Sequence, residues 1–168
     1  MTQCKPQPLV VHGWAVFTHP LFLAQLEALS LHVAALKEKD PVGYTTKSAT
    51  KRLAAIKMLA FDVIPQDPMR PEYRQGDALG PSHVHWFRSK FFQQYRLFFR
   101  YHAPSKVIVY AWVNDETTER AYDRSDDAYR VFCRMIESGN PPNSWEHLLA
   151  EARSLQTLSP RESLGPAW

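Results

Sequence analysis

The sequence predicts an α+β fold, in which an N-terminal strand and a helical hairpin pack on an antiparallel sheet and helices form the C-terminal end. Amphipathic helical stripes occupy residues 20–40 and 45–60, whereas strand-like runs follow one another between residues 84 and 113. Strands that come in succession are expected to pair as a meander. The 168 residues suit one domain over residues 9–157. We expect tails at 1–8 and 158–168, the second one disordered.

The N-terminal half is predicted to form a strand and two helices. The run LVVHGWAVF, residues 9–17, is typical of a strand that is broken or bulged at Gly13. Thr18 or His19 can cap the first helix, and Thr45 or Thr46 the second. Two amphipathic helices joined by a short Pro/Gly turn are expected to pack as a hairpin. Their expected buried positions are Phe22, Leu26, Leu29, Val33, Leu36, Ala49, Leu53, Ile56 and Ala60.

The C-terminal half continues the sheet and then returns to helices. Residues 106–113, KVIVYAWV, are apolar throughout, which is typical of a central strand buried on both faces. A helix capped at Ser125 is expected to end at Gly139. Asn143 and Glu146 are spaced as a capping box for a last helix.

The stretch VHWFRSKFFQQYRLFFRY, residues 84–101, predicts two strands around a hinge at Gln93 and Gln94. Strand alternation places Arg96, Phe98 and Arg100 on one face and Tyr95, Leu97, Phe99 and Tyr101 on the other. A tight hinge brings Lys90 opposite Arg96, with Arg88 beside it. We therefore expect one apolar face covered by helices and one cationic, water-accessible face suited to a phosphate backbone.

The charge distribution supports an anionic partner at one place. Over residues 70–106 the seven Lys and Arg exceed the two Asp and Glu by five (7 − 2), more than the whole-chain net charge of +3. A merely solvated sheet face is the alternative explanation. Beyond Arg88, Lys90 and Arg96, the cations expected to contact RNA are Arg74, Arg100 and Lys106.

Several kinds of site are excluded by missing motifs. The sequence has no phosphate-binding GxxxxGK[ST] loop, no GxGxxG, no HExxH, no GxSxG and no CxxC pair. Two cysteines, Cys4 and Cys133, make neither a disulfide nor a metal framework, so a reducing cytosol is the expected location. His83 and His85 form an HxH pair without a convincing third ligand nearby, so we expect no metal or other cofactor and a packing role for the pair.

A basic face without metal can cleave RNA through the 2′-hydroxyl of the RNA itself. The ribose oxygen attacks phosphorus, and fixed cations stabilise the charge that develops. Arg88 and Arg96 suit this task, and Lys90 could do the same or act as an acid or base. Tyr122 could orient the nucleophile or stack on a base, and His85 or His102 could be acid or base. With Arg96 facing solvent, Arg96→Ala is expected to leave folding nearly unchanged while cleavage falls a hundredfold.

The segments GWAVFTHPLF, DALG, YRLFFRY, WVNDETTERAY and DAYRVFCRMIESGNPPNSWEHL together resemble the YhaV family. These are toxins of type II toxin–antitoxin modules in the RelE-like ribonuclease superfamily, and the resemblance covers about residues 12–150. It implies a small RelE-like α+β domain that cuts mRNA without metal, in many members on the ribosome. It also implies a PrlF-type antitoxin as partner and operator DNA bound by the complex.

The resemblance also implies roles for individual residues. Arg96 matches the arginine that contacts the scissile phosphate, Arg88 and Lys90 match the basic preceding strand, and Tyr122 matches a tyrosine after the last strand. Where relatives often have a further arginine, this chain has Asn114, Asp115 and Glu116, so either Arg120 replaces it or an acidic residue acts as base. Two other functions remain open: a non-catalytic nucleic-acid-binding regulator of its own operon, and a metal-dependent nuclease that uses the HxH pair.

Overall fold

The computed structural model describes residues 8–115 and 127–154. Within them, five strands form one sheet in the order β1-β2-β5-β4-β3. The strands are β1 (Leu9–Val11), β2 (Trp14–Thr18), β3 (Phe87–Phe91), β4 (Tyr95–His102) and β5 (Val107–Val113). Neighbours are antiparallel except for β2 and β5, which run parallel. The α+β class and the antiparallel β3-β4-β5 meander are confirmed; the parallel β2–β5 pair makes the sheet mixed.

Residues 9–17 form a hairpin rather than one interrupted strand. β1 pairs antiparallel with β2 through a turn at His12 and Gly13, both of which have positive φ, +50° and +84°. Successive positive φ values are typical of the two-residue turns that suit the twist of a hairpin. Of the two predicted alternatives, a break at Gly13 is confirmed and a bulge is wrong, because the chain reverses direction there.

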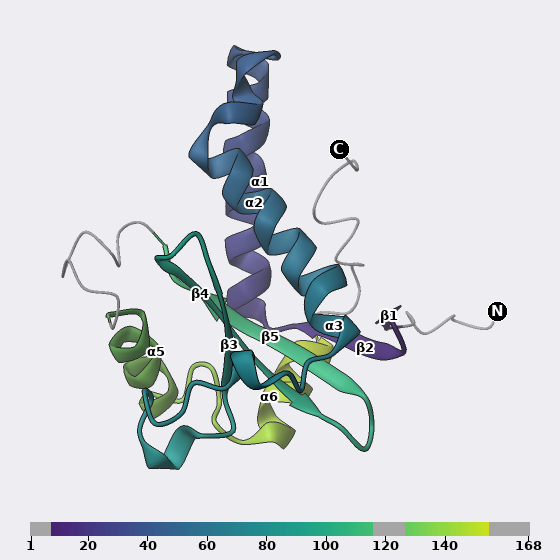
Figure 1. The fold of residues 1–168 in the computed structure, drawn as a ribbon, viewed down its shortest axis with the longest axis vertical. Coiled ribbons are helices and arrows are strands. Elements are labelled where there is room, and N and C mark those ends of the chain that lie inside the picture. The colour runs from purple at the N-terminus through teal and green to yellow at the C-terminus, as the bar shows by residue number, and fades with distance from the viewer. Residues whose placement is uncertain (1–7, 116–126, 155–168) are drawn as a thin grey trace.

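The two N-terminal helices form the predicted hairpin. α1 (Pro20–Lys39) is capped by His19, whose side chain accepts from the Leu21 N–H, and α2 (Ser48–Met58) starts after a 3-10 turn at Gly43–Thr46. The second helix therefore starts a little later than the predicted Thr45 or Thr46. The predicted apolar positions of both helices are buried, with Leu36 partly buried. Figure 1 shows the hairpin standing on one side of the sheet.

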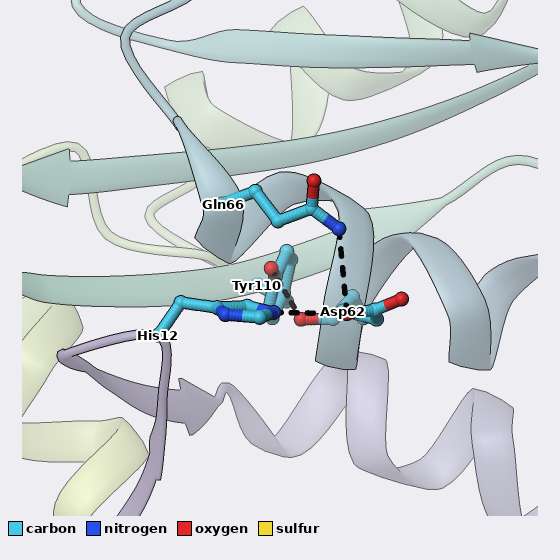
Figure 2. Close-up of polar contacts among 5 residues, drawn as sticks. His12, Asp62, Gln66 and Tyr110 are labelled. Carbon is cyan, nitrogen blue, oxygen red and sulfur yellow. Dashed lines mark hydrogen bonds and ion pairs between the residues drawn. The ribbon is translucent and has the colours of Figure 1, made fainter.

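After α2 the helix widens into a π-helical turn at Leu59–Val63 and ends in α3 (Ile64–Gln66). The Ile64 N–H bonds to the Leu59 carbonyl, five residues back. In the same pattern the Ala60 carbonyl would need the N–H of residue 65, which is a proline and has none. The buried Tyr110 hydroxyl donates to that carbonyl instead, at 2.5 Å (Figure 2).

The chain then crosses the sheet edge and returns to helices. Short 3-10 turns at Pro71–Tyr73 and Pro81–His83 lead into β3, and α5 (Asp127–Glu137) and α6 (Trp145–Ser154) follow β5. Gly139, with φ +89°, ends α5 as predicted. Ser144, rather than Asn143, lies at the N-terminus of α6, where its hydroxyl accepts from the His147 N–H. Ser125, the predicted cap of α5, lies outside the described residues.

Both faces of the sheet are covered by helices (Figure 1). The hairpin packs on Leu97, Phe99, Ile108 and Tyr110, whereas α5 and α6 pack on the other face. That second face carries Phe17, Phe98, Val107, Val109, Ala111 and Trp112. The expectation of a cationic face open to water along its length is wrong, because aromatic and aliphatic side chains alternate with the cations and need cover from water.

A bulge helps to build the second core. Phe98 pairs with Trp112 and Phe99 with Tyr110, which leaves Ala111 as the extra residue in β5. Ala111 and Trp112 consequently both face α5, where Trp112 stacks on Phe132 at a centroid distance of 5.7 Å. No helix in the described part of the chain is long and apolar enough to span a lipid bilayer.

Candidate active site

The predicted register of the two basic strands is confirmed. Lys90 pairs with Arg96 and Arg88 pairs with Phe98 across β3 and β4. Residues directly opposite one another in an antiparallel pair share a face. Arg88, Lys90 and Arg96 therefore lie on the α5 side of the sheet, and the three cations come together as the sequence predicted.

Arg96 is buried, so the expectation that it faces solvent is wrong. Its side chain is 5% exposed, and Nη1 donates to the carbonyls of Gln93, at 2.7 Å, and Tyr95, at 3.0 Å. Asn114 supports the same turn, since its side chain accepts from the Arg96 N–H and donates to the Gln94 carbonyl. Arg96 and Asn114 together brace the β3–β4 turn, which explains a polar residue directly after the buried strand β5.

Arg88 forms the link between the sheet and α5. Its Nε donates to the Tyr129 hydroxyl at 2.8 Å, and its Nη1 donates to the Glu72 carbonyl at 2.7 Å. The Tyr129 ring stands edge-on to Phe98, 5.7 Å between centroids, which positions the hydroxyl beside the strand. Lys90, two residues along β3 on the same face, is exposed. Arg88, Lys90 and Tyr129 thus form a cationic and phenolic group at the rim of the covered face.

Arg100, another predicted RNA contact, is held within the protein. The Arg100 guanidinium lies 5.5 Å from the ring centroids of both Trp86 and Trp145 and donates to the Asn143 carbonyl at 2.6 Å. Burial lowers the pKa of Arg100 to about 10. These contacts fix α6 to β4, so the geometry favours a structural role for Arg100.

Lys106 lies far from Arg88 and Lys90, whereas Arg74 lies beside the start of their strand. Lys106 is in the β4–β5 turn, beyond His102 at the other end of β4 from Arg96. At about 3.4 Å per residue, the six steps from Arg96 to His102 span roughly 20 Å. Arg74 is exposed and forms an isolated bridge with Phe87, beside the start of β3.

His83 and His85 both bond to the side chain of Asn143. Its Oδ1 lies 2.9 Å from His85 Nε2, 3.3 Å from His83 Nδ1 and 3.0 Å from the Trp86 indole nitrogen. An indole N–H can only donate, so the Asn143 atom there is the acceptor oxygen, and both histidine nitrogens donate to it. In its neutral form each ring therefore has its lone pair on the other nitrogen, Nδ1 in His85 and Nε2 in His83.

The residues predicted to act as acid or base differ in their surroundings. Burial lowers the pKa of His85, and the positive charge of Arg100 adds to that lowering, so His85 is a neutral ring at pH 7. His102 lies in the turn after β4, where its Nδ1 is 2.7 Å from the Ser105 hydroxyl. Tyr122, Arg120 and Glu116 lie outside the described residues, so their roles stay predictions. β3 begins at Phe87, after both histidines.

Among the residues that the structure describes, one group of side chains could hold a metal ion. His83, Cys133 and Glu137 offer ligand atoms that all lie within 4.8 Å of one another. The sequence did not indicate this set, because 50 residues separate His83 from Cys133 and the helix α5 has no metal-binding motif of its own.

Comparisons with known proteins show the family of this chain. Residues 16–153 match the family described as a toxin with endonuclease activity, of a toxin–antitoxin system. The chain belongs to the YhaV toxin family. It is 44% identical over 146 residues to Toxin YhaV of Escherichia coli O6:H1 and to Ribonuclease toxin YhaV of Escherichia coli K12, covering 86% of this chain and 95% of each relative. No solved structure matches significantly, so the RelE-like fold stays a prediction.

Membership of the YhaV family identifies the chain as an endonuclease toxin of a toxin–antitoxin system. The residues that sequence reasoning missed are Tyr129 and Asn143. Tyr129 stands inside the segment DAYRVF that carries part of the YhaV resemblance. Its position one residue after the buried Ala128 and three before Phe132 could have placed it at the edge of the buried stripe of α5, facing the sheet.

Proposed function

We propose that this YhaV-family toxin cleaves mRNA without a metal ion, by attack of the ribose 2′-hydroxyl on the adjacent phosphorus. The observation that carries the proposal is the Arg88–Tyr129 hydrogen bond at 2.8 Å, with Lys90 exposed on the same face. A fixed guanidinium, an ammonium and a phenol at one rim provide the charge and the proton donor that this reaction needs.

The two Arg88 bonds to protein leave part of its guanidinium fork for substrate. Nε is taken by Tyr129 and one Nη1 hydrogen by Glu72, and the fork has five N–H donors in all. The remaining donors can bind the non-bridging phosphate oxygens, on which negative charge grows in the transition state. Arg88 is held on two sides before substrate arrives, so little reorganisation is needed when that charge develops.

Tyr129 is the proton-transfer candidate that the described residues support best. Its oxygen accepts the Arg88 Nε–H, so its own hydrogen can be donated to the leaving 5′-oxygen or to a phosphate oxygen. After proton transfer, the positively charged Arg88 guanidinium lies beside the oxygen that has lost its hydrogen. For the second proton transfer, His85 and His102 stay predictions. The predicted roles of Tyr122, to orient the nucleophile or stack on a base, and of Arg120, to replace the further arginine of relatives, also stay predictions.

Arg96 is assigned a positioning role in this proposal. It holds the carbonyls of the β3–β4 turn, and it pairs across the ladder with Lys90. Lys90 then supplies a phosphate contact at the rim. The scissile-phosphate contact that the YhaV resemblance implies for Arg96 is thereby assigned to Arg88.

The proposed partners follow from the family. We infer a cognate antitoxin of the PrlF type that neutralises the toxin, with operator DNA bound by the complex. The alternative function, a non-catalytic regulator, would bind RNA or DNA without cutting either. The cleavage assay described next distinguishes it from the proposal.

The test is cleavage of a messenger RNA by the full-length chain in excess EDTA, on free RNA and on translating ribosomes. We expect cut products with 2′,3′-cyclic phosphate or 3′-phosphate ends. Binding without cutting on both substrates would support the regulator, and ends with a 3′-hydroxyl would exclude attack by the 2′-oxygen.

Matched variants locate the site. Arg88→Ala and Tyr129→Phe are each expected to lower the cleavage rate by about a hundredfold or more, the size of loss that follows removal of a transition-state donor or a general acid. Arg134→Ala, an exposed arginine on α5, and Tyr101→Phe, on the opposite face of the sheet, are the controls and should retain activity. Full activity in Arg88→Ala would remove the basis of the proposed site.

A further inference from the structure

Three side chains with metal-binding chemistry meet where the 3-10 turn Pro81–His83 lies beside α5. Cys133 and Glu137 are four residues apart on one face of α5, with Sγ 3.5 Å from Oε1, and His83 joins them with all ligand atoms within 4.8 Å. Ligands about 2.0–2.3 Å from a tetrahedral zinc ion lie about 3.3–3.8 Å apart. Small side-chain rotations would therefore close the set around one ion.

His83 already makes the outer hydrogen bond that is typical of zinc-bound histidines. Its Nδ1 donates to Asn143 Oδ1, and the Trp86 indole N–H fixes that amide oxygen in place. The imidazole lone pair is consequently on Nε2, and the hydrogen bond at Nδ1 is the kind of outer contact that orients metal-bound histidines. This second observation is independent of the spacing of the three ligand atoms.

We propose that His83, Cys133 and Glu137 bind a zinc ion, with water as the fourth ligand. Thiolate, imidazole and carboxylate donors suit zinc, whereas calcium and magnesium prefer oxygen ligands alone. Binding converts the Cys133 thiol to a thiolate, so one proton is released to solvent for each zinc bound. Apart from this S–H bond no covalent bond in the protein is broken, and no electron is transferred.

The proposed ion joins two segments that the chain order keeps apart. His83 ends the turn that leads into β3 and Arg88, while Cys133 and Glu137 lie one and two turns after Tyr129 on α5. Zinc would therefore lock α5 against the segment before β3, beside the Arg88–Tyr129 bond. Its role is structural, because the cleavage chemistry proposed above assigns no step to it.

The test is metal binding by the full-length, metal-stripped chain. Titration with Co²⁺ should give a 1:1 complex with tetrahedral visible bands and a sulfur-to-cobalt charge-transfer band, and Zn²⁺ should displace the cobalt. Zinc at a hundredfold excess over its Kd should raise the Tm by about 5–10 °C.

The variants come in matched pairs. Cys133→Ser should abolish the charge-transfer band, whereas Cys4→Ser, the other cysteine of the chain, should keep it. Glu137→Gln, an exposed residue whose loss spares the core, should weaken zinc binding at least tenfold, and Glu38→Gln on α1 should not. The zinc-induced change in Tm is compared within each variant, so a change in its basal stability does not affect the result.

A cobalt complex without the sulfur band, or one that persists in Cys133→Ser, would overturn the proposal, as would the absence of any zinc-induced Tm shift in the wild-type chain. Cleavage assays in EDTA are run well below the Tm of the metal-stripped chain. Loss of zinc then lowers stability but leaves cleavage intact, so failure of the zinc site and failure of metal-independent cleavage give different results.

Discussion

Lys90 and Arg96 are directly paired across the β3–β4 ladder, yet Lys90 is exposed while Arg96 is 5% exposed. The pair stands where the ladder meets its turn. The Lys90 residue is open to solvent, whereas the Arg96 guanidinium folds back on the carbonyls of Gln93 and Tyr95. Of the two cations on this face, Lys90 is therefore available to a ligand, and Arg96 makes its contacts within the protein.

This difference predicts opposite effects on stability. Arg96→Ala should lower the free energy of unfolding by about 2–3 kcal/mol, because a charged donor to two carbonyls is lost from a buried site, while the unpaired Nε of Arg96 limits the loss. Lys90→Ala should change it by less than about 0.5 kcal/mol. Urea unfolding of both variants measures the change in the free energy of unfolding. Equal losses in the two variants would mean that the buried contacts of Arg96 do not stabilise the fold.

The RNA affinity of the Lys90 variant should depend on salt less steeply than that of the wild type. An ammonium that neutralises one phosphate contributes about −0.7 to the slope of log K against log salt for single strands. Lys90→Ala should remove about that much, while Lys51→Ala, an exposed lysine on α2, should leave the slope unchanged. Filter binding with an uncleavable RNA at several salt concentrations measures these slopes. Equal slopes for the wild type and Lys90→Ala would exclude a contact between Lys90 and a phosphate.

Tyr110→Phe tests the π-helical turn. The hydroxyl satisfies the Ala60 carbonyl that Pro65 cannot, so its removal leaves a buried acceptor unpaired. We expect a loss of about 1–3 kcal/mol in the free energy of unfolding. Tyr101→Phe, a partly buried tyrosine on the same face, is the control. If thermal and urea unfolding of Tyr110→Phe match the wild type, water or a shifted backbone replaces the bond.

Asp62 lies within this turn and should make the free energy of unfolding depend on pH in acid. His12 Nε2 lies 2.9 Å from Asp62 Oδ1, and this hydrogen bond is the main reason that the pKa of Asp62 is below 3.8 (Figure 2). Because the folded pKa is the lower one, the stabilisation is present above pH 3.8 and is lost as the pH falls through the folded value. The hydrogen bond ties the β1–β2 turn to the π-helical turn after α2.

Asp62→Asn and His12→Gln should therefore both flatten the acid limb of the stability–pH curve, whereas Glu38→Gln should not. Urea unfolding between about pH 2 and 5 gives the three curves, a range that brackets the ordinary carboxyl pKa values. An acid limb in Asp62→Asn as steep as in the wild type would show that other carboxyl groups produce it.

The sequence predicted the elements well because local rules govern them. The stripes of α1 and α2, the His19 cap and the Lys90–Arg96 register all follow from periodicity and turn spacing, and the structure confirms each. The apolar run of β5 also predicted burial on both faces. That observation disagreed with the expectation of an open cationic face, and the burial of Phe98 and Trp112 under α5 shows that the β5 pattern was the better guide.

Long-range placement was decided by tertiary structure alone. The Arg88–Tyr129 bond joins residues 41 positions apart, and the Asn143 contacts to His83, His85 and Trp86 span 57 to 60 positions. No periodicity encodes such distances, since they depend on how α5 and α6 pack on the bulged strand. The sequence determined which residues are cationic, which are apolar, and the order of the helices and strands along the chain. The packing of α5 and α6 on the sheet decided which of the cations reach water. The reason is that burying the apolar side chains of this face also covers the cations that alternate with them.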